Sequence, residues 1–343
     1  MTRPMNVSIT SMIRTAQAVT REGRGILAAD ESSPTMAKRL AAVRVDSTEE
    51  TRRSYREILL STPGLEEFVG GVILFDETIR QQTRDGKPFA RLLSDRGIVP
   101  GIKVDLGIRP LAGSPDEVVT EGLDRLRERL VEYDAMGARF AKWRAVLRIG
   151  DGRPTTACIE ANAHALARYA ALCQEVGLTP IVEPEVLMDG AHDLDECARV
   201  TEAVLHCVYD QLARQHVILE ATLLKPNIVL PGTTCRTPAS DEEIADATLT
   251  TLRRTVPAAV PGILFLSGGQ SDQEATARLD QINRRGHEPW ELSYSFGRAL
   301  QAPVLRAWAG DNSHRTAAQA ALLHRARLNA AARAGAWLPE MED

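Results

Sequence analysis

Short apolar runs recur along this chain, and amphipathic stretches with helical periodicity separate them. Eight such runs are present, at 25–30, 69–75, 99–104, 138–143, 179–183, 218–227, 262–267 and 290–295. Their brevity, their bounding Gly and Pro residues and their Val, Ile and Phe content favour strands over buried helix. Alternation of strand and helix predicts a parallel sheet. Eight such units predict a closed (β/α)8 barrel.

An open doubly wound sheet is the structural alternative, and the absence of GxGxxG after the first strand disfavours it. The 343 residues show no strong break in composition. We therefore expect an α/β fold with a single (β/α)8 TIM-barrel domain over 1–343. It comprises an N-terminal helix within 1–22, the barrel over 23–300 and a C-terminal helical segment over 301–343.

Start signals for helices precede several of the amphipathic stretches. Capping-box patterns occur at Ser47–Glu50, Ser114–Glu117, Ser240–Glu243 and Ser271–Glu274. The pattern at Ser114–Glu117 has proline at the first helical position and predicts a helix that ends at Gly137. An N-terminal helix is indicated by the spacing of Ile9, Met12, Ile13, Ala16 and Val19. From about residue 310 an Ala- and Arg-rich stretch predicts a terminal helix that covers the barrel and ends near Trp337.

The composition excludes several classes of protein. A net charge of −5 disfavours nucleic-acid binding. Five cysteines without CxxC spacing suit reduced thiols and a cytoplasmic location. No stretch approaches the roughly 18 apolar residues of a membrane span, and no secretory signal is evident. The seven histidines lack HxxH or HExxH spacing, so we expect no metal and no cofactor.

Charged and hydroxyl side chains gather at the ends of the predicted strands. In a barrel these ends meet at one mouth, where active sites lie. The residues are Asp30, Lys103, Lys142 with Arg144, Glu183 with Glu185, Lys225, Ser267 with Gly268 and Gly269, and Ser295 with Arg298. A ring of solvated rim charges is the alternative, but three of the chain's five lysines converge there. This concentration favours a site.

Lys225 ends a buried apolar run in a chain that has 36 arginines and only five lysines. A lysine that only snorkels to water is the ordinary interpretation. Lysine, unlike arginine, can lose its proton when buried and act as a nucleophile. Burial and a second ammonium group lower a lysine pKa, and Lys142 is the candidate neighbour. The pattern predicts a Schiff-base lysine, with Glu183 and Glu185 as candidate bases.

Anion-binding groups accompany this lysine. Arg39 and Arg298 offer guanidinium groups, and the turn Ser267–Gly269 leads into a capped helix whose N–H groups suit a phosphate.

The chain resembles class I (Schiff-base) fructose-bisphosphate aldolases. The matching motifs, from about residue 15 to 335, are GILAADES (25–32), GGVILF (70–75), GIKVD (101–105), FAKWR (140–144), VEPE (182–185), LLKPN (223–227), FLSGGQ (265–270) and GRALQ (297–301). The resemblance implies a TIM barrel, commonly a homotetramer. Its activity would be reversible cleavage of the ketose fructose 1,6-bisphosphate to the triose phosphates dihydroxyacetone phosphate and glyceraldehyde 3-phosphate.

The resemblance also implies roles for particular residues. Lys225 matches the Schiff-base lysine, Glu183 the general acid/base and Glu185 its supporting carboxylate. Asp30 matches the aspartate that holds the hydroxyls at the scissile bond, and Lys142 the lysine that assists carbinolamine formation and dehydration.

The substrate-binding set follows in the same way. The family's site for the carbon-1 phosphate is matched here by Ser267, Gly268, Gly269, Ser295, Gly297 and Arg298. The side that receives the carbon-6 phosphate is matched by Ser32, Thr35 and Arg39. Lys103 and Arg144 line the same site. Thr35 stands where the family commonly has serine.

Three questions remain open at this level. Sedoheptulose 1,7-bisphosphate satisfies the same two phosphate anchors, so it is the alternative substrate. A non-catalytic aldolase-like scaffold is the alternative of another class. No tyrosine follows Tyr294, whereas well-studied members end in a tail with a terminal tyrosine. We therefore expect slow exchange of the carbon-3 proton of dihydroxyacetone phosphate and a weaker preference for the bisphosphate.

Overall fold

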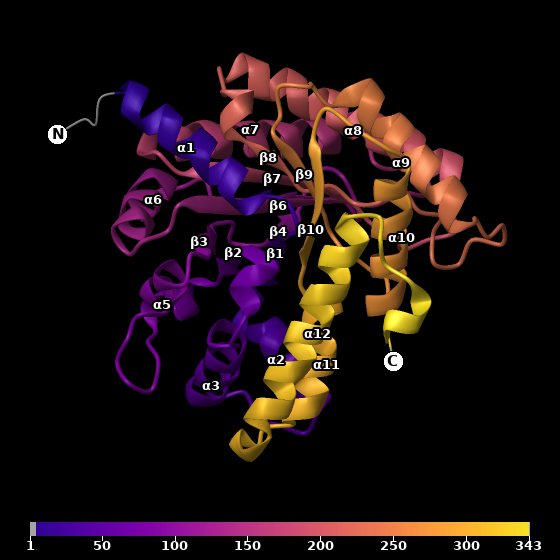
Figure 1. The fold of residues 1–343 in the computed structure, drawn as a ribbon. Helices are drawn as coiled ribbons and strands as arrows, with labels where there is room; N and C mark the ends of the chain where they lie inside the picture. Colours follow the sequence, from indigo (N-terminus) through magenta and orange to yellow (C-terminus); the bar gives the residue numbers. More distant parts are fainter. Residues whose placement is uncertain (1–4, 343) are drawn as a thin grey trace.

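Eight parallel strands form a closed barrel in the computed structural model, which describes residues 5–342 (Figure 1). The strands are β1 (Gly25–Ala29), β2 (Val69–Leu74), β3 (Val99–Lys103), β6 (Phe140–Leu147), β7 (Thr179–Val186), β8 (Leu223–Leu224), β9 (Gly262–Phe265) and β10 (Glu291–Phe296). Their order around the barrel is β1-β10-β9-β8-β7-β6-β3-β2, and β1 pairs with both β2 and β10. The prediction of a closed (β/α)8 barrel is thus confirmed.

Helices surround this barrel and connect its strands (Figure 1). They are α1 (Met5–Val19), α2 (Ser33–Ala41), α3 (Glu49–Leu60), α4 (Asp76–Arg80), α5 (Phe89–Asp95), α6 (Leu126–Ala135), α7 (Thr156–Val176), α8 (Leu194–Arg214), α9 (Asp241–Thr255), α10 (Asp272–Arg284), α11 (Arg298–Trp308) and α12 (Arg315–Arg333). The predicted capping boxes at Ser240 and Ser271 begin α9 and α10. Helix α12 packs against α10 and α11, as expected of the terminal helix.

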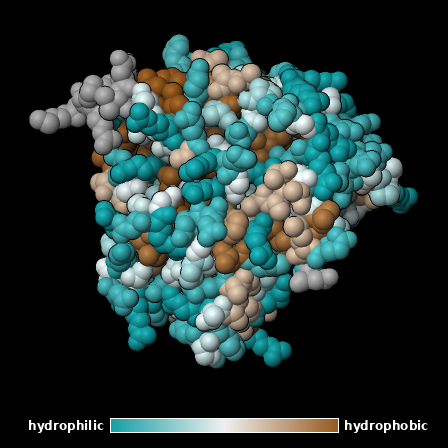
Figure 2. All heavy atoms as spheres, viewed as in Figure 1, coloured by the Kyte–Doolittle hydropathy of each residue, from teal (hydrophilic) through white to brown (hydrophobic). Residues whose placement is uncertain are grey.

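Two hydrophobic clusters hold the barrel together. The larger one lies between the barrel strands and the helices around them. The smaller one fills the barrel interior with side chains such as Ile26, Ile73, Phe140 and Leu264, and Ala16 of α1 joins it. Because every strand is almost wholly buried, the strands read as continuous apolar runs rather than as alternating ones. On the face seen in Figure 2, hydrophobic residues appear as small separate patches among hydrophilic ones.

The predicted helix start at Ser114–Glu117 is wrong, although the helix itself is present over 126–135, with Leu126, Leu130 and Tyr133 buried. A two-stranded antiparallel hairpin, β4 (Ile108–Pro110) and β5 (Val118–Thr120), occupies this segment, and α6 begins only at Leu126. The Glu117 carboxylate does not cap a helix there. It accepts hydrogen bonds from the backbone N–H and the hydroxyl of Thr155, at 2.7 and 2.6 Å, and so fastens the hairpin to the start of α7.

Two boundaries also differ from the predictions. Thr48 and Thr51 form the capping box of α3, one residue beyond the predicted Ser47–Glu50 pair. The apolar run 218–227 supplies only a two-residue strand, preceded by a 3-10 turn at Leu219–Ala221. The Gln174 side chain takes up the backbone N–H and C=O of Ile218, which removes that residue from the sheet.

Candidate active site

A cavity of about 710 Å³ opens at the mouth of the barrel, where the strands end. It is lined by every predicted site residue except Gly269: Asp30, Ser32, Thr35, Arg39, Lys103, Lys142, Arg144, Glu183, Glu185, Lys225, Ser267, Gly268, Ser295, Gly297 and Arg298. The structure therefore brings together residues that are almost 270 positions apart in the sequence, as the strand-end argument predicts.

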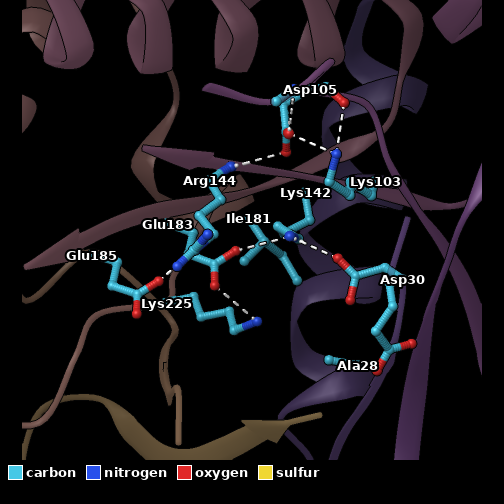
Figure 3. Close-up of polar contacts among 12 residues, drawn as sticks. Ala28, Asp30, Lys103, Asp105, Lys142, Arg144, Ile181, Glu183, Glu185 and Lys225 are labelled. Atoms are coloured by element: carbon cyan, nitrogen blue, oxygen red, sulfur yellow. Dashed lines mark hydrogen bonds and ion pairs between the residues drawn. The ribbon is translucent and has the colours of Figure 1, made fainter. Parts of the chain in front are cut away.

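Two lysines share one carboxylate at the centre of this cavity (Figure 3). Lys225 Nζ lies 3.0 Å from Glu183 Oε1, and Lys142 Nζ lies 3.0 Å from Glu183 Oε2. Lys142 Nζ also lies 2.7 Å from Asp30 Oδ2. The side chains of Lys142, Glu183 and Lys225 are at most 5% exposed. Strands β6 and β7 and the residues directly after β1 and β8 supply these groups, so four parts of the barrel fix their geometry.

The ionisation of Asp30, Glu183 and Lys142 is governed by their charged neighbours rather than by solvent. Burial opposes ionisation of Asp30 and Glu183, but the ammonium groups of Lys142 and Lys225 together outweigh it and hold the pKa of both carboxyls below the ordinary value. Burial likewise opposes the Lys142 ammonium, yet Asp30 and Glu183 together raise its pKa well above the usual range. Lys142 is therefore a fixed positive charge at neutral pH.

Asp105 organises the next layer and was missed from the sequence. Its side chain lies 2.6 Å from Lys103 Nζ and accepts a hydrogen bond of 3.2 Å from the backbone N–H of Arg144 (Figure 3). The Arg144 guanidinium in turn pairs with Glu185. The available signal was the GIKVD motif, in which Asp105 stands two residues after Lys103 and so on the same side of an extended chain.

The turn after β9 approaches the cavity closely. A Cβ atom on Gly268 would lie 2.7 Å from Glu185 Oε1, so only glycine fits. Gly269 has φ of +76° and packs against Met188, which explains why it supports the turn without lining the cavity. Ser295 Oγ is buried with no hydrogen-bond partner among the described residues. Gly297 is the N-cap of α11, which begins with Arg298 at the cavity wall.

Glu31 anchors the cavity wall beside Gly297 and was also missed. Its carboxylate binds the guanidinium groups of Arg39 and Arg56 and accepts a hydrogen bond of 2.7 Å from Gln301 Nε2. α2, α3 and α11 thus meet at one buried acid. In the sequence nothing distinguishes Glu31 from an exposed loop glutamate, because its partners are 8 to 270 positions away. Nearby, the hydroxyls of Ser32 and Thr35 lie 3.1 Å apart and line the cavity.

Within residues 5–342 no group of three or more His, Cys, Asp or Glu side chains is placed to hold a metal ion. No helix in the same range is long and apolar enough to cross a membrane.

A buried lysine beside a carboxylate, in a cavity rich in cations, has the groups needed for covalent chemistry on a carbonyl. Comparison with known proteins bears on this directly. A model of the family described as "Glycolytic: Fructose-bisphosphate aldolase class-I" matches residues 11–343. A probable fructose-bisphosphate aldolase class 1 from Xanthomonas campestris is 55% identical over 332 residues, which are 96% of this chain and 99% of that protein.

Two further relatives agree. The cytosolic fructose-bisphosphate aldolase 5 of Arabidopsis thaliana is 53% identical over 95% of this chain and 91% of its own. A crystal structure of fructose-bisphosphate aldolase from Plasmodium falciparum superposes with a TM-score of 0.96 at 46% identity, covering 97% of this chain and 96% of that one. The chain belongs to the class I fructose-bisphosphate aldolase family.

Proposed function

We propose that the protein cleaves fructose 1,6-bisphosphate reversibly to dihydroxyacetone phosphate and glyceraldehyde 3-phosphate, with Lys225 as the Schiff-base lysine. The observation that carries this assignment is the buried contact of 3.0 Å between Lys225 Nζ and Glu183 Oε1. A nucleophile must lie within hydrogen-bond reach of its base. Lys142 is held by two carboxylates, whereas Lys225 contacts one and faces the cavity.

The chemistry can be followed atom by atom. Glu183 takes a proton from the Lys225 ammonium, and the free amine adds to carbon 2 of the ketose. The carbinolamine loses its hydroxyl as water with that proton, which leaves an iminium and regenerates the Glu183 carboxylate. Glu183 then accepts the proton of the carbon-4 hydroxyl while the bond between carbons 3 and 4 breaks. The electron pair of the broken bond neutralises the iminium, which becomes an enamine. Protonation of the enamine at carbon 3 restores an iminium, and water then hydrolyses this iminium and releases dihydroxyacetone phosphate.

The neighbouring charges support each of these steps. Asp30, kept ionised by Lys142, accepts hydrogen bonds from the substrate hydroxyls at the scissile bond. Lys142 is a permanent cation that stabilises the departing oxygen of the carbinolamine. The ion pair with Arg144 keeps the Glu185 carboxylate in place beside Glu183.

The two ends of the cavity suit two phosphates. At one end, Ser267, Gly268, Gly269, Ser295, Gly297 and Arg298 form the proposed carbon-1 phosphate site. The α11 N-terminus and the turn before α10 direct backbone N–H groups toward an anion there. The proposed contacts of the carbon-6 phosphate are Ser32, Thr35 and Arg39, and Lys103 and Arg144 line the same cavity.

Trapping with borohydride tests the mechanism. Reduction in the presence of dihydroxyacetone phosphate should leave one stable adduct on Lys225, located by peptide mass spectrometry. Lys225→Met should abolish cleavage and the adduct. Lys87→Met removes an exposed lysine paired with Asp95 and should change neither. An adduct elsewhere, or cleavage by Lys225→Met, would contradict the assignment, and complete loss of activity in EDTA would favour a metal-dependent enzyme.

Substrate length and assembly complete the proposal. Kinetics with fructose 1,6-bisphosphate and sedoheptulose 1,7-bisphosphate side by side should rank the two sugars by kcat/KM.

On the family resemblance we also propose a homotetramer that acts in the cytoplasm on phosphorylated ketoses and triose phosphates. Light scattering of the purified protein should give four times the chain mass.

A further inference from the structure

The charges on the cavity wall do not balance. Seven cationic side chains and five carboxylates line the cavity. Five of the cations each contact a carboxylate: Arg39 with Glu31, Lys103 with Asp105, Lys142 with Asp30, Arg144 with Glu185 and Lys225 with Glu183. The remaining two are Arg109, whose ion pair with Glu121 spans 3.7 Å, and Arg298, which has no ion-pair partner among the described residues. A substrate with two phosphates would therefore meet two guanidinium groups that no carboxylate of the cavity wall neutralises.

Arg109 is the unexpected member of this pair. It lies on β4 of the hairpin found at the predicted helix start, and its side chain is 60% exposed. The nearest carboxylate oxygen, Glu121 Oε2, is 3.7 Å from its Nε, which is too far for a hydrogen bond. One guanidinium N–H group donates to the backbone carbonyl of the preceding residue, Ile108, at 3.1 Å. Binding an anion would cost Arg109 little, because it gives up no strong partner.

The hairpin is held firmly at its base while Arg109 reaches outward. Asp105, which binds Lys103, also accepts a hydrogen bond of 3.2 Å from the Gly107 N–H. On the other strand, Thr120 N–H donates to Asn162 Oδ1 of α7 at 3.2 Å. The backbone of Arg109 is thus fixed relative to the cavity, and only its side chain has to move.

Arg109 and Arg298 lie on different sides of the mouth. The hairpin follows β3, and Arg298 follows β10. In the barrel order, β1 and β2 separate these strands on one side, and four strands separate them on the other. The two unneutralised guanidinium groups are therefore placed for the two ends of one ligand rather than for one phosphate.

We propose that Arg109 binds the substrate phosphate distal to the Schiff base and so sets the preference for a bisphosphate over a 1-phosphate. This inference rests on the proposed function and adds a residue that its motifs do not include. A planar guanidinium can bind a phosphate through two parallel hydrogen bonds. Because Arg109 is exposed, salt should weaken its contribution more than that of the buried contacts.

Kinetics with two sugars test the inference. Arg109→Ala should raise KM for fructose 1,6-bisphosphate about tenfold and leave kcat within about twofold, since one charge-assisted contact is lost. KM for fructose 1-phosphate, which lacks the distal phosphate, should not change. Arg109→Lys should restore part of the affinity. Arg127→Ala removes an equally exposed arginine from α6 and serves as the matched control.

Two outcomes would overturn the inference. One is an Arg109→Ala enzyme whose KM stays within twofold for the bisphosphate or rises equally for both sugars. The other is an equal loss in Glu121→Gln, which would show that Arg109 only braces the hairpin. Calorimetric binding of hexitol 1,6-bisphosphate, which cannot be cleaved, separates this inference from the proposed function. Weaker binding to Arg109→Ala supports it even if the wild-type protein fails to cleave the sugar, and equal binding refutes it even if cleavage is observed.

Discussion

Lys142→Met should destabilise the protein in a way that depends strongly on pH. In the native site Lys142 is the ion-pair partner of Asp30, and among the described residues Asp30 has no second one. Removing the ammonium leaves a buried carboxylate, which costs about 3–5 kcal/mol in other proteins. Protonation of Asp30 sets an upper limit to this cost. Protonating a carboxyl with an ordinary pKa near 3.9 costs about 1.4 kcal/mol for each pH unit above that pKa. The cost is therefore about 4 kcal/mol at pH 7 and about 1.5 kcal/mol at pH 5.

The direction of the pH dependence of stability follows from the pKa shifts in the wild type and in Lys142→Met. In the wild type the Asp30 and Glu183 pKa values are lowered, so these groups stabilise the fold above about pH 4 and lose that effect as pH falls. Without Lys142, burial should raise the Asp30 pKa, so stability should instead be lost as pH rises. Lys142→Met should therefore lose about 4 kcal/mol at pH 7 and less than half of that at pH 5.

Urea unfolding at the two pH values measures this difference. The double variant Lys142→Met with Asp30→Asn should recover most of the loss at pH 7, because residue 30 then carries no buried charge. Lys87→Met, which breaks an exposed pair, should stay within about 1 kcal/mol of the wild type at both pH values. A loss in Lys142→Met that is the same at pH 5 and pH 7, or that Asp30→Asn does not relieve, would refute the reasoning.

Three further substitutions probe the site and its frame. Arg298→Ala should raise KM about tenfold for both fructose 1,6-bisphosphate and fructose 1-phosphate, and an unchanged KM would place the carbon-1 phosphate elsewhere. Gly268→Ala puts a Cβ 2.7 Å from Glu185 Oε1 and should lower kcat/KM about 10- to 100-fold through displacement of that carboxylate; full activity would mean that the turn yields easily. Gly101→Ala puts a Cβ 2.1 Å from the ring of Phe140 and should cost about 2–3 kcal/mol in urea unfolding with little effect on KM. A stability equal to the wild type would show that the barrel interior can repack.

The barrel could be predicted because its strands are buried on both faces. Several are then short apolar runs that end at a polar residue, such as Asp30 or Lys225, and these residues line one mouth. The hairpin at 108–120 could not be predicted in this way. Ser114–Glu117 carries all the local signals of a helix start, but Glu117 satisfies Thr155 instead, and that contact joins residues 38 positions apart.

The same limit explains the missed site residues. Patterns in the sequence identify groups that end a strand, whereas Glu31 and Asp105 act through partners on other elements. Pairing of charges is equally invisible in the sequence. Lys103 and Arg109 look alike as cations after one strand, but the fold neutralises the first with Asp105 and leaves the second exposed.

The loop that follows α1 is held by α12. Helix α1 covers the barrel end away from the mouth, with Met12 and Val19 buried, and the guanidinium of Arg333 in α12 binds backbone carbonyls of Thr20, Arg21 and Arg24. During synthesis at about 5–20 residues per second, about 15–60 s separate the emergence of these two segments from the ribosome. The carbonyls of Thr20, Arg21 and Arg24 lack this partner for that time, although the apolar face of α1 can already pack on β2, β3 and β7. A ribosome stalled before Arg333 should therefore hold a chain in which residues 20–24 are still accessible to proteases.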